Sequence, residues 1–420
     1  MNNESITVAL DIGTTRIRAI IGEPCENGLL EISGVGTSPS RGMRGGVVVN
    51  IESTLRSVVE AIEAAELMSG RTVKSCWTSI GGTSIEGRIS KGVVAVNVNK
   101  QREAREISAY DMERVMEAAR AVNFPMDREV LDVIPQSYKV DDQGGIRNPI
   151  DMIGVRLESE VHIITCPKTS VQNLVRCVNR AGFHVDGLVL QPLAAGTAVL
   201  TEEEKDLGVA VIDLGGGTTN ALVYGNGAPF ATFSVPVGGQ QVTNDISIVK
   251  SVSFETAEKI KIEAGCCWAP LLEGQDAEII VPGMGGRAPF SIRRSSLLQI
   301  IEPRVKETFV LVKEKLDKIS ATRPLGGGIV LTGGGAMLQG AADLAAQVFK
   351  LPVRIGDPLP LGGLADDYCS PEFATALGLA VEADMRSRRG AVSGEAKGHD
   401  ARRPAGFISR LANWVKTEFF

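Results

Sequence analysis

The feature that most constrains this chain is a short pattern that occurs twice. Residues 6–15 read ITVALDIGTT and residues 209–219 read VAVIDLGGGTT, so each is an apolar run that leads into an aspartate, a glycine turn and two threonines. A short apolar run before a glycine turn is typical of a buried strand. A third such run, residues 329–331, precedes three glycines at 333–335. The repetition predicts two equivalent halves, and therefore an α/β fold with a duplicated core.

Segments with helical periodicity lie between these strands. Apolar residues recur at helical spacing over residues 54–68, 108–122 and 169–181, and a glycine follows the first and the third segment. A glycine just past the last turn is a common helix stop. A chain of 420 residues is longer than one hydrophobic core usually serves, so we expect at least two folding units.

Composition argues against several classes of protein. A net charge of −6 supplies no field that would gather nucleic acid, so nucleic acid is not an expected partner. Seven scattered cysteines and only three histidines predict reduced thiols of a cytoplasmic protein and no zinc site. No apolar run approaches about 18 residues and no signal-peptide pattern is present, so we expect a protein that is neither secreted nor membrane-spanning.

The two repeated glycine turns are candidates for a polyphosphate cradle. Glycine lets the backbone approach a ligand closely, and unpaired amides supply hydrogen-bond donors. Two carboxylates, Asp11 and Asp213, would then hold a hydrated Mg²⁺ through its waters. Each turn alone could equally be a β-hairpin in which glycine and aspartate serve geometry only. The candidate phosphate ligands are Gly13, Thr14, Thr15, Gly215, Gly216, Gly217, Thr218 and Thr219.

The third glycine turn fits an adenosine site. Gly333, Gly334 and Gly335 precede Met337, and they put bare backbone where a flat base could lie, beside helix N-terminal amides. The turn lacks the Gly-Lys-Ser/Thr of a Walker A loop and the spacing of a Rossmann fingerprint, so both of those alternatives are set aside.

Five segments in order resemble the nucleotide-binding motifs of the actin, Hsp70 and sugar-kinase superfamily: residues 11–15, 191–196, 213–219, 328–335 and 374–379. In that superfamily they correspond to phosphate 1, connect 1, phosphate 2, adenosine and connect 2. The resemblance implies an actin-like fold, in which each of two lobes is a mixed sheet flanked by helices. It also implies ATP and Mg²⁺ bound between the lobes.

Over nearly its full length the chain is further similar to the FtsA family of bacterial cell-division proteins. The segments that carry this similarity have no general role in phosphate binding: residues 133–138, 162–166, 200–209, 285–287, 301–304 and 353–356. The family resemblance implies filaments of the protein itself on the cytoplasmic face of the inner membrane at the septum, capture of the FtsZ C-terminal tail and assembly with later division proteins. It implies subdomains 1A (1–85 and 162–206), 1C (86–161), 2A (207–237 and 304–385) and 2B (238–303), a disordered linker (386–405) and a membrane-targeting amphipathic helix (406–420).

Three residues depart from the family pattern near the expected phosphates. Arg16 stands where FtsA proteins usually have lysine, and it could contact phosphate as a fork of donors. Gln191 and Asn220 replace the usual glutamate and aspartate, and neither amide can act as a general base. We therefore expect ATP binding with at most slow hydrolysis, in which Gln191 positions water. Glu258 and Lys261 resemble the ribose and base contacts, although a surface helix with alternating charge has the same pattern.

A local basic cluster, Arg287, Arg293 and Arg294, lies in the expected subdomain 2B. Such a cluster is usually only a solvated face. The family resemblance makes it the candidate site for the FtsZ tail.

The C-terminal segment has the pattern of an interfacial helix. Placed at 100° per residue, its apolar side chains share one arc that basic residues border. From Arg386 onward eight basic residues stand against three acidic ones, which favours anionic lipid. A terminal helix docked on the body of the protein or on a partner protein is the alternative. The residues expected at the membrane are Phe407, Ile408, Arg410, Leu411, Trp414, Val415, Lys416 and Phe419.

Other functions share this fold. A kinase would need a catalytic aspartate base and a sugar-sized pocket, and no candidate base is evident. A chaperone would need a substrate-binding domain, and the residues after Met385 are too few for one. A pilus-assembly relative of FtsA shares the core but is not expected to carry the amphipathic tail, so the tail discriminates between the two.

Overall fold

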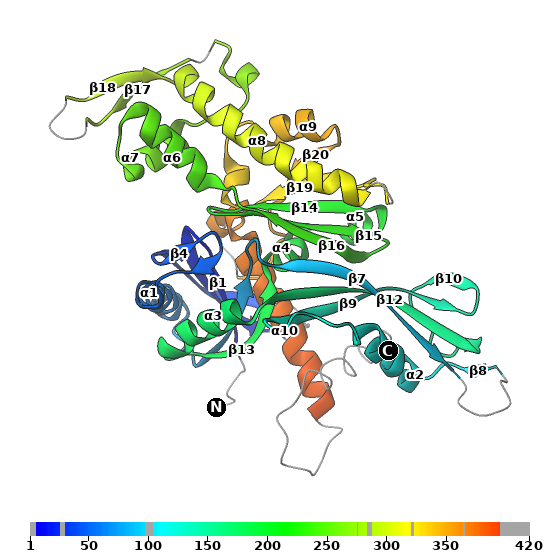
Figure 1. Cartoon of the computed structure of the whole chain (residues 1–420). Coiled ribbons are helices and arrows are strands. Elements are labelled where there is room, and N and C mark those ends of the chain that lie inside the picture. Colours follow the sequence, from blue (N-terminus) through cyan, green and yellow to red (C-terminus); the bar gives the residue numbers. More distant parts are fainter. Residues whose placement is uncertain are drawn as a thin grey trace.

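The computed structural model describes residues 6–25, 30–96, 104–274, 276–283, 288–320, 323–363 and 366–394. Two five-stranded sheets of the same construction form its core (Figure 1). In each, the central strand is antiparallel to a meander on one side and parallel to a crossover strand on the other. The predicted duplication is confirmed. The matching orders are β13 (His184–Leu190), β6 (Ser75–Ile80), β1 (Thr7–Ile12), β2 (Arg16–Pro24), β3 (Leu30–Pro39) and β20 (Val353–Ile355), β19 (Ile329–Thr332), β14 (Val209–Leu214), β15 (Thr219–Gly225), β16 (Ala228–Val235).

The central strands β1 and β14 are buried at every residue. Continuous burial explains their uninterrupted apolar runs, because a strand covered on both faces has no solvent side for alternating polar residues. Asp11 and Asp213 are buried too, but they are the charged residues in these otherwise mostly apolar strands, and each stands one residue before the end of its strand. The fold therefore carries two buried carboxylates to equivalent edges of the two sheets.

Helices α1 (Ile51–Ser69) and α3 (Lys168–Arg180) pack beside one another on the first sheet. The side chain of Asn50 caps α1 by accepting a hydrogen bond from the Ser53 amide, and Gly70 ends the helix in a left-handed conformation with φ of 68°. The helices predicted over 54–68 and 169–181 are confirmed.

Helices α4 (Gln191–Val199) and α10 (Ala374–Gly394) lie between the two sheets (Figure 1). Helix α10 packs on β1, β2 and β6, whereas α4 reaches β14 and β15 of the second sheet. The two helices approach closely at Gly378, where a Cβ would overlap the carbonyl group of Ala194. The lobes thus share one helical layer.

A separate four-stranded sheet is inserted between β6 and α3. Helix α2 (Ala109–Arg120) covers it and begins in a capping box formed by Ser108 and Asp111, which confirms the helix predicted over 108–122. Three strands of this sheet, two of them interior, contact β16 of the second lobe. Its strand order is β10 (Gln143–Ile146), β9 (Arg128–Val140), β12 (Arg156–Pro167) and β7 (Glu86–Ala95), with a small adjoining pair β8 (Arg105–Glu106) and β11 (Ile153–Gly154).

Two further groups of elements complete the second lobe. Helices α8 (Arg294–Ser320) and α9 (Ala341–Phe349) pack on its sheet, and α6 (Gly239–Lys250), α7 (Phe254–Ala264) and the hairpin β17 (Glu278–Val281)–β18 (Phe290–Arg293) extend one end of it (Figure 1). The remaining short elements are β4 (Met43–Arg44), β5 (Val47–Val48), α5 (Glu202–Leu207), η1 (Ala269–Leu272), η2 (Gly334–Met337), η3 (Asp366–Tyr368) and η4 (Pro371–Phe373).

The expected start of the linker at residue 386 is wrong, because α10 continues to Gly394. Arg386 binds Asp132 and Glu382 through its guanidinium at 2.9 and 3.2 Å. These ion pairs hold the helix where large apolar residues are lacking. The rest of the linker and the whole amphipathic segment 406–420 lie outside the described residues. Within the described ranges, no helix is both long enough and apolar enough to cross a bilayer.

Candidate functional site

The two repeated turns are hairpins that face each other across the lobes. Each closes through a backbone hydrogen bond, from Gly13 N to Arg16 O at 3.1 Å and from Gly215 N to Thr218 O at 3.0 Å. A Cβ on Gly217 would lie 2.7 Å from Thr14 Oγ1, so the second turn touches the first. The hairpin interpretation and the phosphate interpretation are therefore compatible, since the hairpins bring both sets of turn amides together.

Some of the turn amides are available to a ligand. Within the described part of the chain, the N–H groups of Gly216 and Gly217 donate to no protein acceptor. Hydroxyl groups differ in availability: Thr14 Oγ1 accepts from Gly46 N at 3.1 Å, and Thr219 Oγ1 donates to Val237 O at 2.8 Å. The structure thus assigns Thr219 a backbone contact within its own lobe, while the free amides can bind phosphate oxygens.

Asp11 and Asp213 form a buried pair of carboxylates. Burial raises the pKa of Asp11, partly offset by a hydrogen bond from Ser79 Oγ at 2.6 Å. Burial and, to a smaller extent, the negative charge of Asp11 raise the pKa of Asp213 to about 7. In the described ranges no cluster of three or more histidine, cysteine or acidic side chains could hold a metal alone. Mg²⁺ usually takes one or two carboxylates and completes its coordination with water and phosphate, so the donor set of Asp11 and Asp213 suits it.

A chain of neutral side chains connects the two carboxylates. Gln191 donates through Nε2 toward Asp11 Oδ1 at 3.5 Å and Ser79 Oγ at 3.3 Å, and its Oε1 accepts from Asn220 Nδ2 at 3.5 Å. Ser234 donates to Asn220 Oδ1. Both amides are buried at this network, so they orient polar atoms but accept no proton. Ser79 has a place in the site that the sequence did not indicate.

The third turn lies against the same carboxylates. Gly333 adopts φ of 82°, and a Cβ there would overlap Asp213, so glycine is required for the close approach. Gly334 is open, with Glu372 Cβ 3.9 Å from where its own Cβ would stand. Gly335 contacts Leu214, and the Met337 side chain is exposed.

Glu258 and Lys261 reach the phosphate turns from α7. They form an ion pair at 2.7 Å, and Lys261 Nζ also donates to Gly239 O at 3.2 Å. Gly239 in turn donates its amide to Gly215 O at 2.9 Å. The pair is thus more than a solvated face, since two hydrogen bonds connect it to the second glycine turn.

Two arginines on β2 differ in placement. Arg16 is exposed at the start of the strand, beside the first turn. Arg18 is buried, pairs with Glu372 and lies opposite Asp11 in the strand register. The sequence prediction missed Arg18, although a charged residue inside the apolar run RIRAII was the available signal.

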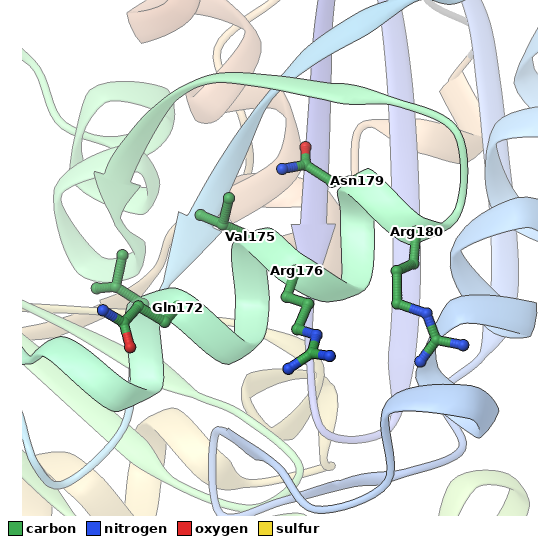
Figure 2. A pocket seen from close by; sticks show the side chains of 6 residues that line it. Gln172, Val175, Arg176, Asn179 and Arg180 are labelled. Carbon is green, nitrogen blue, oxygen red and sulfur yellow. The ribbon is translucent and has the colours of Figure 1, made fainter.

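Other predicted residues lie away from this site. Arg293 is exposed, 4.0 Å from Glu278, whereas Arg294 donates to Ala264 O at 3.0 Å and to Gln339. Arg287 and the predicted membrane residues lie outside the described residues. An open hollow on α3, in which Arg176 and Arg180 point to the same side, contains none of the predicted site residues (Figure 2).

The duplicated sheets, with facing glycine turns beside the paired carboxylates, define an actin-like fold. Solved structures agree on the fold: the PilM-PilN type IV pilus biogenesis complex has a TM-score of 0.65 at 16% identity, covering 91% of this chain and 99% of that chain. MreB5 of Spiroplasma citri bound to AMPPNP has a TM-score of 0.52 at 13% identity, covering 94% and 99%.

Sequence comparison defines the family. The family model "Cell division protein FtsA" matches residues 210–378, and the model of the SHS2 domain inserted in FtsA matches residues 82–165. Cell division protein FtsA of Borreliella burgdorferi is 45% identical over 100% of both chains, and that of Pseudomonas aeruginosa is 41% identical over 98% of both. That of Escherichia coli K12 is 37% identical over 99% of both. The chain belongs to the FtsA family of cell-division proteins.

Proposed function

We propose that this chain is an ATP-binding, polymerising adaptor that tethers FtsZ filaments to the cytoplasmic face of the cell membrane and helps assemble the septal division machinery. Membership of the FtsA family supports the role in division. The observation that carries nucleotide binding is the contact between the two glycine turns beside Asp11 and Asp213.

In this proposal the free turn amides bind the phosphates of ATP, and Asp11 and Asp213 hold Mg²⁺ through water. The ion would neutralise charge on the polyphosphate. Gln191 orients a water molecule, while the absence of a carboxylate at Gln191 and Asn220 leaves that water without a general base. Hydrolysis is therefore slow, and ATP acts mainly by binding.

Gly334→Val tests the nucleotide site. Because the position is open, the variant is expected to fold as the parent does while its side chain blocks the approach of the base. ATP affinity, measured by calorimetry in Mg²⁺, is expected to fall at least about 100-fold, which corresponds to about 2.7 kcal/mol. Gly144→Val is the matched control, since no atom lies within 4 Å of its Cβ position in the inserted sheet.

Unchanged ATP affinity in Gly334→Val would place the base elsewhere. The parent is further expected to turn over ATP more slowly than roughly 1 s⁻¹, the low end of typical enzymes. A faster rate would contradict the assignment of Gln191 and Asn220.

We propose that the FtsZ tail binds at the basic cluster of the second lobe. Of its described members, Arg293 is exposed and makes only a long 4.0 Å ion pair with Glu278, which an acidic partner can replace, whereas Arg294 holds α8 to the end of α7. Arg293→Ala is therefore expected to weaken binding of an FtsZ tail peptide without lowering the melting temperature, and Arg294→Ala to lower the melting temperature. Equal peptide affinity in parent and Arg293→Ala would remove the cluster from the binding site.

A further inference from the structure

Arg18 places a buried positive charge beside the two carboxylates. It lies directly opposite Asp11 in the β1–β2 pairing, and opposite residues of an antiparallel pair point to the same face. Its side chain is 9% exposed. The charge of Arg18 lowers the pKa of both Asp11 and Asp213, against the larger upward effect of burial.

The other side of Arg18 is held by η4. Its Nη2 pairs with Glu372, and its guanidinium carbon lies 4.7 Å from the centre of the Phe373 ring. The same short helix touches the third glycine turn, because Gly333 N donates to Pro371 O at 3.0 Å. Arg18 is thus located between the carboxylate pair and the turn expected to hold adenosine.

The guanidinium retains a donor. Arg18 Nε is buried and has no hydrogen-bond partner among the described residues. A buried donor without a partner is costly, so its presence at a ligand site indicates that a ligand oxygen or a water molecule satisfies it when the site is filled. Arginine suits this task, since its planar fork binds phosphate oxygens and keeps its charge.

We propose that Arg18 is a nucleotide-site residue that supplies part of the positive charge otherwise provided by Mg²⁺, and that Glu372 limits how much of this charge reaches the phosphates. The proposal rests on the proposed function, because it concerns the same nucleotide site. Its consequence is that removing Mg²⁺ weakens ATP binding less than it would if Asp11 and Asp213 faced the phosphates without Arg18.

The measured quantity is the ratio of the ATP dissociation constant in EDTA to that in saturating Mg²⁺. Arg18→Gln is expected to raise this ratio about tenfold, since a partly buried unit charge several ångströms from the phosphates is worth on the order of that factor. Glu372→Gln is expected to lower the ratio, because it releases the arginine charge toward the phosphates. The double variant is expected to match Arg18→Gln alone.

Arg71→Gln is the matched control. It breaks an Arg–Glu pair, Arg71–Glu23 at 2.6 Å, at the opposite end of the same strand β2, and it is expected to leave the ratio unchanged. If Arg18→Gln does not fold, Glu372→Gln still tests the proposal. Stronger ATP binding in EDTA by this variant is not expected if the Arg18–Glu372 pair is only structural.

Two failures are distinguishable. A parent protein that binds no ATP in Mg²⁺ overturns the proposed function, and the assignment of Arg18 with it. A parent that binds ATP while Arg18→Gln and Glu372→Gln change both dissociation constants by the same factor overturns only the assignment of Arg18.

Discussion

His162 is buried on β12 where the inserted sheet meets the second lobe. It is 1% exposed, and neither ring nitrogen has a hydrogen-bond partner in the described part of the chain. The space around it is tight, since a Cβ on Gly87 would overlap its ring and would lie 2.9 Å from Thr232 of β16. Burial lowers the pKa of His162 to about 4, and the neighbouring charge of Asp132 only partly offsets this effect. The folded protein therefore holds a neutral imidazole.

The first prediction at the residue scale concerns acid stability. The unfolded chain protonates His162 near pH 6.5 and the folded chain only near pH 4, so unfolding takes up a proton between these values. The free energy of unfolding is expected to fall as pH drops from about 6.5 to 4, by up to about 3 kcal/mol. The free energy of unfolding, measured by urea denaturation at several pH values in this range, should depend less steeply on pH in His162→Phe than in the parent. His184→Phe, at an exposed position, should show the same pH dependence as the parent.

At the scale of elements, α10 shows how charged side chains extend a helix. Arg386 connects the helix to Asp132 on β9 of the inserted sheet, and its side chain is 25% exposed. Arg386→Gln removes the guanidinium from two partly buried carboxylates, Asp132 and Glu382, so a loss of about 2 kcal/mol is expected, below the value for a fully buried pair. Amide hydrogen exchange should also accelerate over residues 386–394.

The neighbouring pair supplies the comparison. Arg388 binds a single buried carboxylate, Asp384 at 2.9 Å, within the same helix and is itself 40% exposed, so Arg388→Gln is expected to cost about 1 kcal/mol. If the two variants lose equal stability, the connection to β9 is not what holds the end of α10.

The same helix shows why some elements follow from sequence and others do not. Strands β1, β14 and β19 and helices α1, α2 and α3 were predicted because apolar spacing and caps are local signals. The end of α10 was not, because Arg386 and Asp132 are 254 residues apart. The site follows the same rule: both glycine turns were predicted, whereas the role of Arg18 depends on Glu372, 354 residues away.

At the scale of the whole molecule, the inserted sheet connects both lobes. It continues from the first lobe and binds the second through Arg323–Glu160 at 2.8 Å and a hydrogen bond from Gln136 to Pro229 O. Arg147 also pairs with Asp206 of α5, a short helix that packs on β15, at 2.5 Å. These contacts are mostly polar, and polar interfaces within a chain permit relative motion. If nucleotide binds between the lobes as proposed, it can alter the position of the inserted sheet, and with it any surface that the sheet offers to another subunit.

Membrane attachment is the last prediction, and it depends on the assembled protein. The residues after the described end of α10 include five basic and three acidic side chains, a smaller net positive charge than a count from Arg386 gives, because Arg386, Arg388 and Arg389 belong to α10. A single copy of the predicted helix 406–420 should therefore bind anionic lipid weakly, and aligned copies in a filament should bind strongly. In sedimentation with anionic vesicles, the parent with ATP is expected to pellet, while Trp414→Glu and a chain ending at Arg403 stay in the supernatant. Gly334→Val, which lacks nucleotide but keeps the tail, is expected to pellet less than the parent. Equal pelleting of the truncated chain would show that another surface binds the membrane.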